Sequence, residues 1–352
     1  MRALYVRRTQ LASVNLKRAS VWLLKDLISP KHKRRNNRFY GQDGFFEASI
    51  ASVCNIDSCT LRELRRRLKF IHHDYDVLII NWNSVPRKAD RRKLFSFISA
   101  NDNLVKVLLH SKANESEMPD DATLDMFDLV FKREHYRDLE KYPISDVNRQ
   151  KIRTTMLACP LIEVSHFDDL AAFDPLSEFR NLPETASEHD VFFAGKTTNS
   201  MRMNVWEKVA NSNFKYVGGL QPHKTMTERE KRYRVPRFKR ADYIDTVRKT
   251  RVNLALKGSG SFTYRHLELL CLRAFTLSSP SVRDVVTPLA LEENKHYTTF
   301  NDLDDMVEKI RYYCEHDEER RKIGSAGQAL FEREYDFNRH GQYILDQIRP
   351  LL

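Results

Sequence analysis

The sequence contains little glycine, little cysteine and no long apolar run. Of its 352 residues, ten are glycine and five are cysteine. The cysteines are scattered, odd in number and without a close CxxC pair, so neither a disulfide framework nor a zinc site is indicated. No stretch approaches the roughly 18 to 20 apolar residues that cross a bilayer, and the first residues are typical of a strand, not of a signal peptide. We therefore expect a cytoplasmic protein.

Two glycine-rich phosphate motifs are missing as well. The GxxxxGK[ST] spacing of a P-loop is absent, and so is the GxGxxG fingerprint of dinucleotide-binding proteins. Kinases and dinucleotide enzymes are therefore disfavoured. Hydrophobic residues make up 41% of the chain and charged residues 30%, which is enough apolar material for real cores. A chain of this length suits two domains.

Strands and helices alternate along the chain in two series. The first series has apolar strands expected at 3–6, 77–80, 105–109 and 129–131. The second has strands expected at 191–194, 214–217, 252–256 and 275–277, and helices at 201–210, 243–249, 264–272, 302–316, 318–334 and 338–348. Such alternation is typical of parallel sheets covered by helices, in which ligands bind at the carboxyl ends of the strands.

The pattern predicts an α/β fold with two doubly wound domains that face a cleft. We place an N-terminal domain at 1–172 and a linker rich in proline and acidic residues at 173–190. The C-terminal domain is placed at 191–337. A last helix, within 338–352, could pack back on the N-terminal domain.

Half of the glycines lie in one stretch of the second domain, each after a predicted strand: Gly195, Gly218, Gly219, Gly258 and Gly260. A strand that ends in glycine and leads into a helix lets backbone N–H groups approach phosphate oxygens, and the helix dipole favours the negative charge. The second domain is therefore the predicted phosphate binder.

The best candidate loop follows the strand at 252–256. It supplies charged, hydroxyl and aromatic side chains at the strand end and in the first helical turn: Lys257, Ser259, Ser261, Thr263, Tyr264 and Arg265. Glu268 lies further along the helix, within reach of ribose hydroxyls if a nucleotide stacks there. The alternative is an ordinary Gly/Ser turn with a surface arginine. A second loop, after Gly195, offers Lys196 and Arg202 to a diphosphate, or these two are solvated surface cations.

The segment from residue 243 to 334 resembles the C-terminal domain of GT-B glycosyltransferases, closest to the CgeB-type and exostosin-like groups. The shared pattern is a strand, a small-residue loop and an Arg265-x-x-Glu268 helix, followed by a second set of motifs. That set comprises Tyr297-x-x-Phe300, Asp302-Leu303, a helix with Asp317-x-Glu319-Arg320-Arg321, and Ala326-Gly327.

The resemblance implies transfer of a sugar from a nucleotide-sugar donor to a hydroxyl of a glycan or lipid-linked acceptor. In that family the helix glutamate binds the donor ribose, which implies this role for Glu268, and Arg265 would face the diphosphate. Many retaining members carry a second glutamate eight positions earlier, where this chain has Gly260. Retention and inversion at the sugar therefore both stay open.

No metal and no cofactor beyond the nucleotide-sugar co-substrate is expected. A metal-dependent transferase would need Asp-x-Asp at the carboxyl end of a strand, whereas Asp74-Tyr-Asp76 precedes its strand. Asp302 and Asp304 begin a helix, where acids favour the dipole without any ligand. We expect lysine, arginine and N–H groups to stabilise the departing diphosphate.

An inverting reaction needs a general base, which the first domain should supply across the cleft. The candidates are Asp43 in a predicted glycine-containing loop at 40–44, His110 at the end of a strand, and Glu134 or His135 after another strand. For each of them the alternative is an ordinary polar residue.

Most of the formal charge of +11 comes from residues 1–40, where 11 basic residues face a single acid, Asp26. An anionic membrane surface, a phosphate-rich acceptor or nucleic acid would be attracted to this region, and plain solubility is the alternative. We favour a peripheral contact of residues 31–38 with the inner membrane face and disfavour nucleic acid. The rival function is a nucleic-acid-binding or scaffold protein with a degenerate transferase-like fold.

Overall fold

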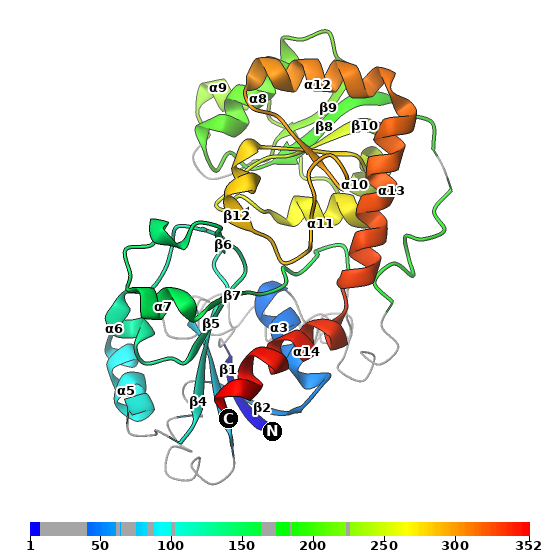
Figure 1. Ribbon diagram of the computed structural model, residues 1–352. Helices are drawn as coiled ribbons and strands as arrows, with labels where there is room; N and C mark the ends of the chain where they lie inside the picture. Colours follow the sequence, from blue (N-terminus) through cyan, green and yellow to red (C-terminus); the bar gives the residue numbers. More distant parts are fainter. Residues whose placement is uncertain are drawn as a thin grey trace, which may run out of the picture.

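The computed structural model describes residues 1–7, 41–60, 64, 75–82, 88–99, 103–162, 174–183, 185–222 and 226–352. The helix predicted around residues 16–28 and the basic segment 31–38 lie outside these ranges. Two separate parallel sheets, each covered by helices, form two domains (Figure 1). Within the part of the chain that is described, no helix is both long and apolar enough to span a membrane.

The first sheet has six parallel strands. Across the sheet they are β2 Asn55–Thr60, β1 Arg2–Arg7, β3 Val77–Asn81, β4 Val105–His110, β5 Leu129–Lys132 and β7 Ile152–Thr154. Successive residues of β3 are buried on opposite faces: Val77 and Ile79 join one core, Leu78 and Ile80 the other. Burial on both faces explains the continuous apolar runs that predicted the central strands.

Helices of the first domain are α3 Gly41–Ala51, α5 Lys88–Ser99, α6 Asp121–Leu124, α7 Asp146–Gln150 and the 3-10 turn η4 Leu139–Lys141. The prediction of a loop around Asp43 is wrong, because this residue lies in the first turn of α3. Phe45 and Phe46 are both buried, on different sides of α3, and they hold the segment as a helix despite its two glycines. The side chain of Asp43 lies outside the described residues.

The second sheet has five parallel strands. Across the sheet they are β13 Thr298–Thr299, β11 Thr276–Ser278, β10 Thr250–Ala255, β8 His189–Gly195 and β9 Tyr216–Leu220. Its helices are α8 Ser200–Ala210, α9 Glu228–Lys231, α10 Arg240–Arg248, α11 Tyr264–Cys271, α12 Leu303–Glu315, α13 Asp317–Glu334 and the 3-10 turn η6 Pro280–Asp284. The predicted helices of this domain are confirmed to within a few residues.

Two glycines predicted to follow a strand instead lie inside β9. Gly218 has φ of +97° and Gly219 has φ of +148°. A Cβ at Gly218 would lie 2.1 Å from the carbonyl oxygen of Phe193 in β8. Glycine is needed here so that β9 can pair closely with β8, not so that a phosphate can approach.

The last helix, α14 Phe337–Ile348, leaves the second domain and packs against α3 (Figure 1). A Cβ at Gly341 would lie 1.9 Å from the carbonyl oxygen of Ser49, so the two helices touch backbone to backbone. The side chain of Ile344 belongs to the apolar core on one face of the first sheet. A short 3-10 turn, η7 Arg349–Leu351, ends the chain.

A two-stranded antiparallel sheet joins the domains. Its strands are β6 His135–Tyr136, just after β5, and β12 Val285–Val286, just after η6. The N–H of Arg137 continues this contact by donating to the carbonyl oxygen of Asp284 at 2.8 Å. The carboxyl end of β5 is thereby held beside the second domain.

Candidate functional site

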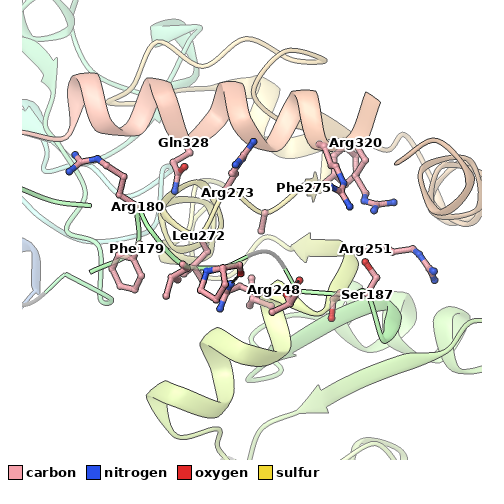
Figure 2. A pocket seen from close by; sticks show the side chains of 17 residues that line it. Phe179, Arg180, Ser187, Arg248, Arg251, Leu272, Arg273, Phe275, Arg320 and Gln328 are labelled. Carbon is pink, nitrogen blue, oxygen red and sulfur yellow. Dashed lines mark hydrogen bonds between the residues drawn. The ribbon is translucent and has the colours of Figure 1, made fainter. Parts of the chain in front are cut away.

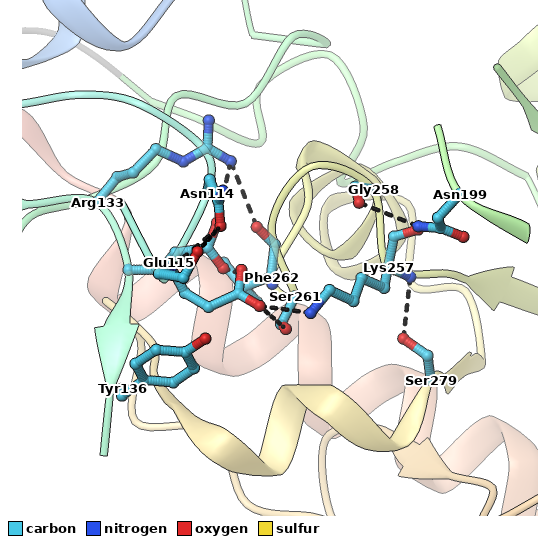
Figure 3. A network of polar contacts seen from close by, with 12 residues as sticks. Asn114, Glu115, Arg133, Tyr136, Asn199, Lys257, Gly258, Ser261, Phe262 and Ser279 are labelled. Carbon is cyan, nitrogen blue, oxygen red and sulfur yellow. Dashed lines mark hydrogen bonds and ion pairs between the residues drawn. The ribbon is translucent and has the colours of Figure 1, made fainter. Parts of the chain in front are cut away.

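The loop after β10, residues 256–263, inserts against the first domain. A Cβ at Gly260 would lie 1.8 Å from the carbonyl oxygen of Ala113 and 1.9 Å from Oε1 of Glu134. No side chain fits at this point, so the contact requires glycine. Two loops of the first domain, after β4 and after β5, therefore meet the predicted donor loop directly (Figure 3).

Glu115, in the loop after β4, binds two of the predicted donor-binding side chains. Its Oε1 accepts a hydrogen bond from Nζ of Lys257 at 2.5 Å and from Oγ of Ser261 at 3.1 Å (Figure 3). Burial by itself would raise the pKa of the Glu115 carboxyl, but the hydrogen bond from Lys257, a backbone hydrogen bond, the charge of Lys257 and the hydrogen bond from Ser261 together outweigh it and lower that pKa. Glu115 is therefore ionised, and its side chain is 3% exposed.

Glu134, in the loop after β5, reaches the same donor loop. Its Oε2 accepts a hydrogen bond from the N–H of Phe262 at 2.6 Å. Its Oε1 lies 3.6 Å from Nη2 of Arg133 and has no hydrogen-bond partner among the described residues. Burial raises the pKa of Glu134 to about 7, although the charge of Arg133 opposes this. This carboxyl group therefore exchanges a proton near neutral pH.

Helix α11 begins directly after this loop. Near its start, Nδ1 of His266 accepts a hydrogen bond from the N–H of Thr263 at 3.0 Å, and Nε2 of His266 lies 2.8 Å from Oγ of Ser278. Burial lowers the pKa of His266 to about 4, so its imidazole is neutral. Tyr264 is exposed and lies under the guanidinium of Arg133, 5.1 Å from the ring centroid. Ser259, in the loop, is exposed as well.

Arg265 and Glu268 form a compact cluster with Tyr243 of α10. Nη2 of Arg265 donates to the carbonyl oxygen of Ala194 at 2.5 Å, and its guanidinium lies over the Tyr243 ring at 4.5 Å. Oε2 of Glu268 accepts from the Tyr243 hydroxyl at 2.9 Å and lies 3.5 Å from Nη1 of Arg265. This Nη1 has no hydrogen-bond partner in the described ranges. Arg265 thus links the start of α11 to the carboxyl end of β8.

Burial sets the protonation of this cluster. It raises the pKa of Glu268, while the charge of Arg265 and the hydrogen bond from Tyr243 oppose the rise. The side chains of Arg265 and Glu268 keep 17% and 14% of their surface exposed.

Arg202, at the start of α8, is occupied by backbone carbonyls. It donates from Nε to Lys257, from Nη1 to Lys196 and from Nη2 to Leu256, at 2.8 to 2.9 Å. A Cβ at Gly258 would lie 2.9 Å from its Nη2, and one at Gly195 would lie 3.2 Å from its Nη1. These two glycines therefore make room for the guanidinium.

This arrangement gives Arg202 a positioning role between the loops after β8 and β10. Burial lowers the pKa of its guanidinium to about 10, with a smaller contribution from the charge of Arg265. The side chain of Lys196, by contrast, is exposed beside the end of β8. It is the predicted cation of this loop that points to solvent.

His110 ends β4 at the carboxyl edge of the first sheet and is completely buried. Neither ring nitrogen has a hydrogen-bond partner within the described part of the chain. Burial, followed by the charges of Lys132 and Lys112, lowers the pKa of His110 to about 3.

His135 is held on both sides, with Nδ1 2.8 Å from the carbonyl oxygen of Tyr136 and Nε2 2.9 Å from Oγ1 of Thr154.

Sequence reasoning missed several polar residues of this region. Lys132 is fully buried at the end of β5, donates to the carbonyl oxygen of Asn114 at 2.7 Å, and has its pKa lowered by burial to about 8. The run Lys132-Arg133-Glu134 directly after an apolar strand is a signal that could have marked all three. Glu115 and Tyr243 carry no comparable local signal.

Among the described residues, no group of three or more His, Cys, Asp or Glu side chains could hold a metal ion.

Comparison with protein families matches residues 198–346 to the family described as Glycosyl transferase-like. No curated protein matches the chain by sequence. The solved structure of Anabaena HepE in complex with UDP-glucose is similar, with 10% identity and a TM-score of 0.52 over 99% of this chain and 100% of that one. Sucrose-phosphate synthase from Thermosynechococcus elongatus gives 10% identity and a TM-score of 0.52, over 99% and 98%.

S. aureus TarM is also similar, with 11% identity and a TM-score of 0.51 over 82% of this chain. The match spans only 57% of the length of TarM. These likenesses, together with the two parallel sheets, show that the chain has the GT-B fold of two Rossmann-like domains. The glycosyl transferase-like region is the second domain with the returning helix α14.

Proposed function

We propose that this protein is a glycosyltransferase that moves a sugar from a nucleoside-diphosphate sugar to a hydroxyl of a glycan or lipid-linked acceptor. The observation that carries the proposal is the Arg265–Glu268 pair at the start of α11, in the second Rossmann-like domain of a GT-B fold. A solved structure with this fold contains UDP-glucose. A UDP-sugar is therefore the first donor to test.

Glu268 is proposed to bind the donor ribose, as the family resemblance implies. Arg265 would bind the diphosphate through Nη1, which is buried and has no hydrogen bond among the described groups, so donor binding would have to uncover it. Lys257 and the first N–H groups of α11 add positive potential at the same end of the helix. These fixed cations and dipoles could neutralise a departing diphosphate, so the reaction is proposed to need no metal.

Donor binding would compete with the two carboxylates of the first domain. Glu115 now accepts from Lys257 and Ser261, and Glu134 accepts from the N–H of Phe262. Phosphate oxygens are acceptors for the same donors. A bound diphosphate would therefore take the place of one or both carboxylates, and the loop would separate from the first domain by a small distance.

Glu134 is the proposed general base. Its Oε1 lies 1.9 Å from where a Cβ of residue 260 would stand. The carboxyl group of Glu134 therefore occupies space that the side chain of a glutamate at position 260 would need. A carboxylate with a pKa of about 7 can remove a proton from a hydroxyl at neutral pH. His110, with a pKa of about 3, is the weaker base. Asp43 is left as an alternative from sequence only.

The proposed reaction is a single displacement with inversion. The acceptor hydroxyl gives its proton to Glu134 and its oxygen forms a bond to the anomeric carbon of the sugar. The bond from that carbon to the diphosphate oxygen breaks, and the nucleoside diphosphate leaves with the electron pair. Lys257 and Arg265 are the cations proposed to stabilise this charge.

Release of the nucleotide, a diphosphate from UDP- and GDP-sugars and a monophosphate from cytidine-monophosphate sugars, tests the proposal. UDP-, GDP- and cytidine-monophosphate sugars are incubated with wild type, with Glu268→Gln and with Glu319→Gln, an exposed control on α13. We expect turnover of at least one donor by wild type and the control, and strong loss in Glu268→Gln. Turnover of no donor by folded protein, or equal turnover in all three, would overturn the proposal.

The membrane contact of residues 31–38 also stays a proposal, because these residues lie outside the described ranges. Sedimentation with anionic and neutral lipid vesicles tests it. We expect binding to the anionic vesicles alone, weakened when Arg34 and Arg35 are both changed to glutamine. Equal sedimentation with both kinds of vesicle would contradict the electrostatic origin.

A further inference from the structure

A second concentration of positive charge lies at the other edge of the second sheet, where its strands begin. A cavity of about 160 Å³ opens there between residues 179–183 and 185–187, the start of β10 and helix α13 (Figure 2). Six arginines line it: Arg180, Arg248, Arg251, Arg273, Arg320 and Arg321. We call this cavity the arginine pocket.

Four carboxylates neutralise part of this charge. Arg180 pairs with Asp174 and Glu332, Arg251 with Asp190, and Arg320 and Arg321 with Asp317. Arg248 and Arg273 form no ion pair in the described part of the chain. Arg248 donates to the carbonyl oxygen of Pro183, and Arg273 donates to Oγ of Ser325 at 2.8 Å. Among the described residues, Arg248 and Arg273 are therefore the two arginines of the pocket that have no carboxylate partner.

The backbone of Arg273 gives independent support for a ligand. Arg273 follows the end of α11 with φ of +57°, a left-handed conformation that usually carries glycine after a helix. Helix α13 fixes this position, because a Cβ at Gly324 would lie 2.6 Å from the carbonyl oxygen of Arg273. An arginine at a position that favours glycine places a guanidinium in the pocket at a conformational cost.

Favourable interactions with helix dipoles explain the positions of only some of the arginines in the pocket. Arg248 ends α10, where a cation is favourable beside the helix dipole without any ligand. Arg251, Arg320 and Arg321 belong instead to a strand and to the start of α13, where the dipole disfavours cations. The walls between the arginines are partly apolar, with Val247, Leu272 and Phe275.

We propose that the arginine pocket binds a small ligand through a phosphate dianion. Two unpaired guanidiniums match the two charges of a phosphate monoester, and arginine binds phosphate oxygens bidentately. The volume of about 160 Å³ suits inorganic phosphate or a phosphate on a compact organic body. This site lies at the opposite edge of the sheet from Arg265 and Glu268 and does not depend on the function proposed above.

Calorimetric titration with inorganic phosphate and with glucose 6-phosphate distinguishes the two sources of the dianion. The main variant is Arg273→Gly, which removes the guanidinium and relieves the left-handed backbone, so its melting temperature should not fall. The matched control is Asn294→Gly, the other non-glycine residue with a positive φ (63°) in the described ranges. Arg248→Gln is a second pocket variant.

We expect saturable binding of at least one of the two probes. Arg273→Gly and Arg248→Gln should each weaken it at least tenfold, whereas Asn294→Gly should leave it unchanged. Lys257→Met, a change at the proposed donor site, should also leave it unchanged. Tighter binding of glucose 6-phosphate than of phosphate identifies the organic ester as the ligand class, and the reverse order identifies free phosphate.

Two results would overturn the proposal. One is the absence of saturable binding of either probe to wild-type protein. The other is binding that survives Arg273→Gly and Arg248→Gln, or that is lost in Lys257→Met, because the anion would then occupy another site. Failure of the donor proposal alone would change none of these outcomes.

Discussion

Two loops of the first domain each present one carboxylate to the same loop of the second, and the two carboxylates differ in charge state. Glu115 receives the ammonium of Lys257, which lowers its pKa despite burial. Glu134 receives only a backbone N–H and a more distant guanidinium, so burial dominates and raises its pKa to about 7. One carboxylate is thus a stable ion-pair partner, and the other can exchange a proton.

The comparison shows how similar positions acquire different chemistry. Both side chains are nearly inaccessible, at 3% exposure for Glu115 and 0% for Glu134. For Glu115, hydrogen bonds from Lys257, the backbone and Ser261 together with the charge of Lys257 outweigh desolvation, whereas the partners of Glu134 do not. We expect single substitutions to remove the ion pair of Glu115 and the proton exchange of Glu134 independently of each other.

The largest expected effect is on catalysis by Glu134→Gln. Loss of a general base lowers kcat by roughly 10²- to 10⁴-fold. For wild type, the rate should rise with pH through about 7 as Glu134 loses its proton. Measurement of kcat and KM from pH 5.5 to 8.5 tests both points. A variant that keeps the wild-type rate and pH profile would remove Glu134 from the reaction.

The second effect is on stability, also in Glu134→Gln. The folded pKa of Glu134 is about 7 against 4.5 for an unperturbed carboxyl, so folding binds a proton between these values. Its contribution to the free energy of unfolding therefore falls as pH rises from 4.5 to about 7, by at most about 3 kcal/mol. Glutamine cannot ionise, so the variant should exceed wild type in stability at pH 8 and not at pH 4.5.

Urea unfolding at pH 4.5 and pH 8 measures this difference. The control is Glu319→Gln, whose carboxyl lies on the exposed face of α13. A difference between Glu134→Gln and wild type that is the same at both pH values would show that Glu134 is ionised throughout, contrary to the account above.

The smallest effect is expected for Glu115→Gln. Lys257 keeps 35% of its side-chain surface in water, so loss of its partner should cost about 1 kcal/mol of unfolding free energy. The freed ammonium should bind a nucleoside diphosphate a few-fold more tightly than in wild type. Urea unfolding and a UDP titration measure the two changes. Weaker UDP binding in this variant would contradict competition between Glu115 and phosphate.

The fold could be predicted largely from sequence because its strands are short apolar runs bounded by helices. β3 is buried along its whole length, and four of its five residues are apolar. β2 was missed because its sequence, NIDSCT, is polar and lies at the edge of the sheet. α3 was missed because its two glycines suggest a loop, whereas contacts with α14 hold it.

Of the candidate site, only the contacts between residues close in sequence could be predicted. Arg265 and Glu268 lie one helical turn apart, so their contact follows from spacing on α11. Glu115 and Lys257 are 142 residues apart, and Tyr243 and Glu268 are 25 apart on different helices. No local pattern encodes such contacts, because they depend on how the sheets and domains pack. The role of Gly258 as space for Arg202 was hidden for the same reason.

The most direct test of the central claim is a calorimetric titration of UDP into wild type and Glu268→Gln at pH 7.5, with Glu319→Gln as control. Glu268→Gln keeps the size of the side chain and removes the charge that would bind the ribose. The account predicts saturable binding in wild type and control, weakened at least tenfold in Glu268→Gln. Equal affinity in all three proteins would contradict a nucleotide site at the start of α11.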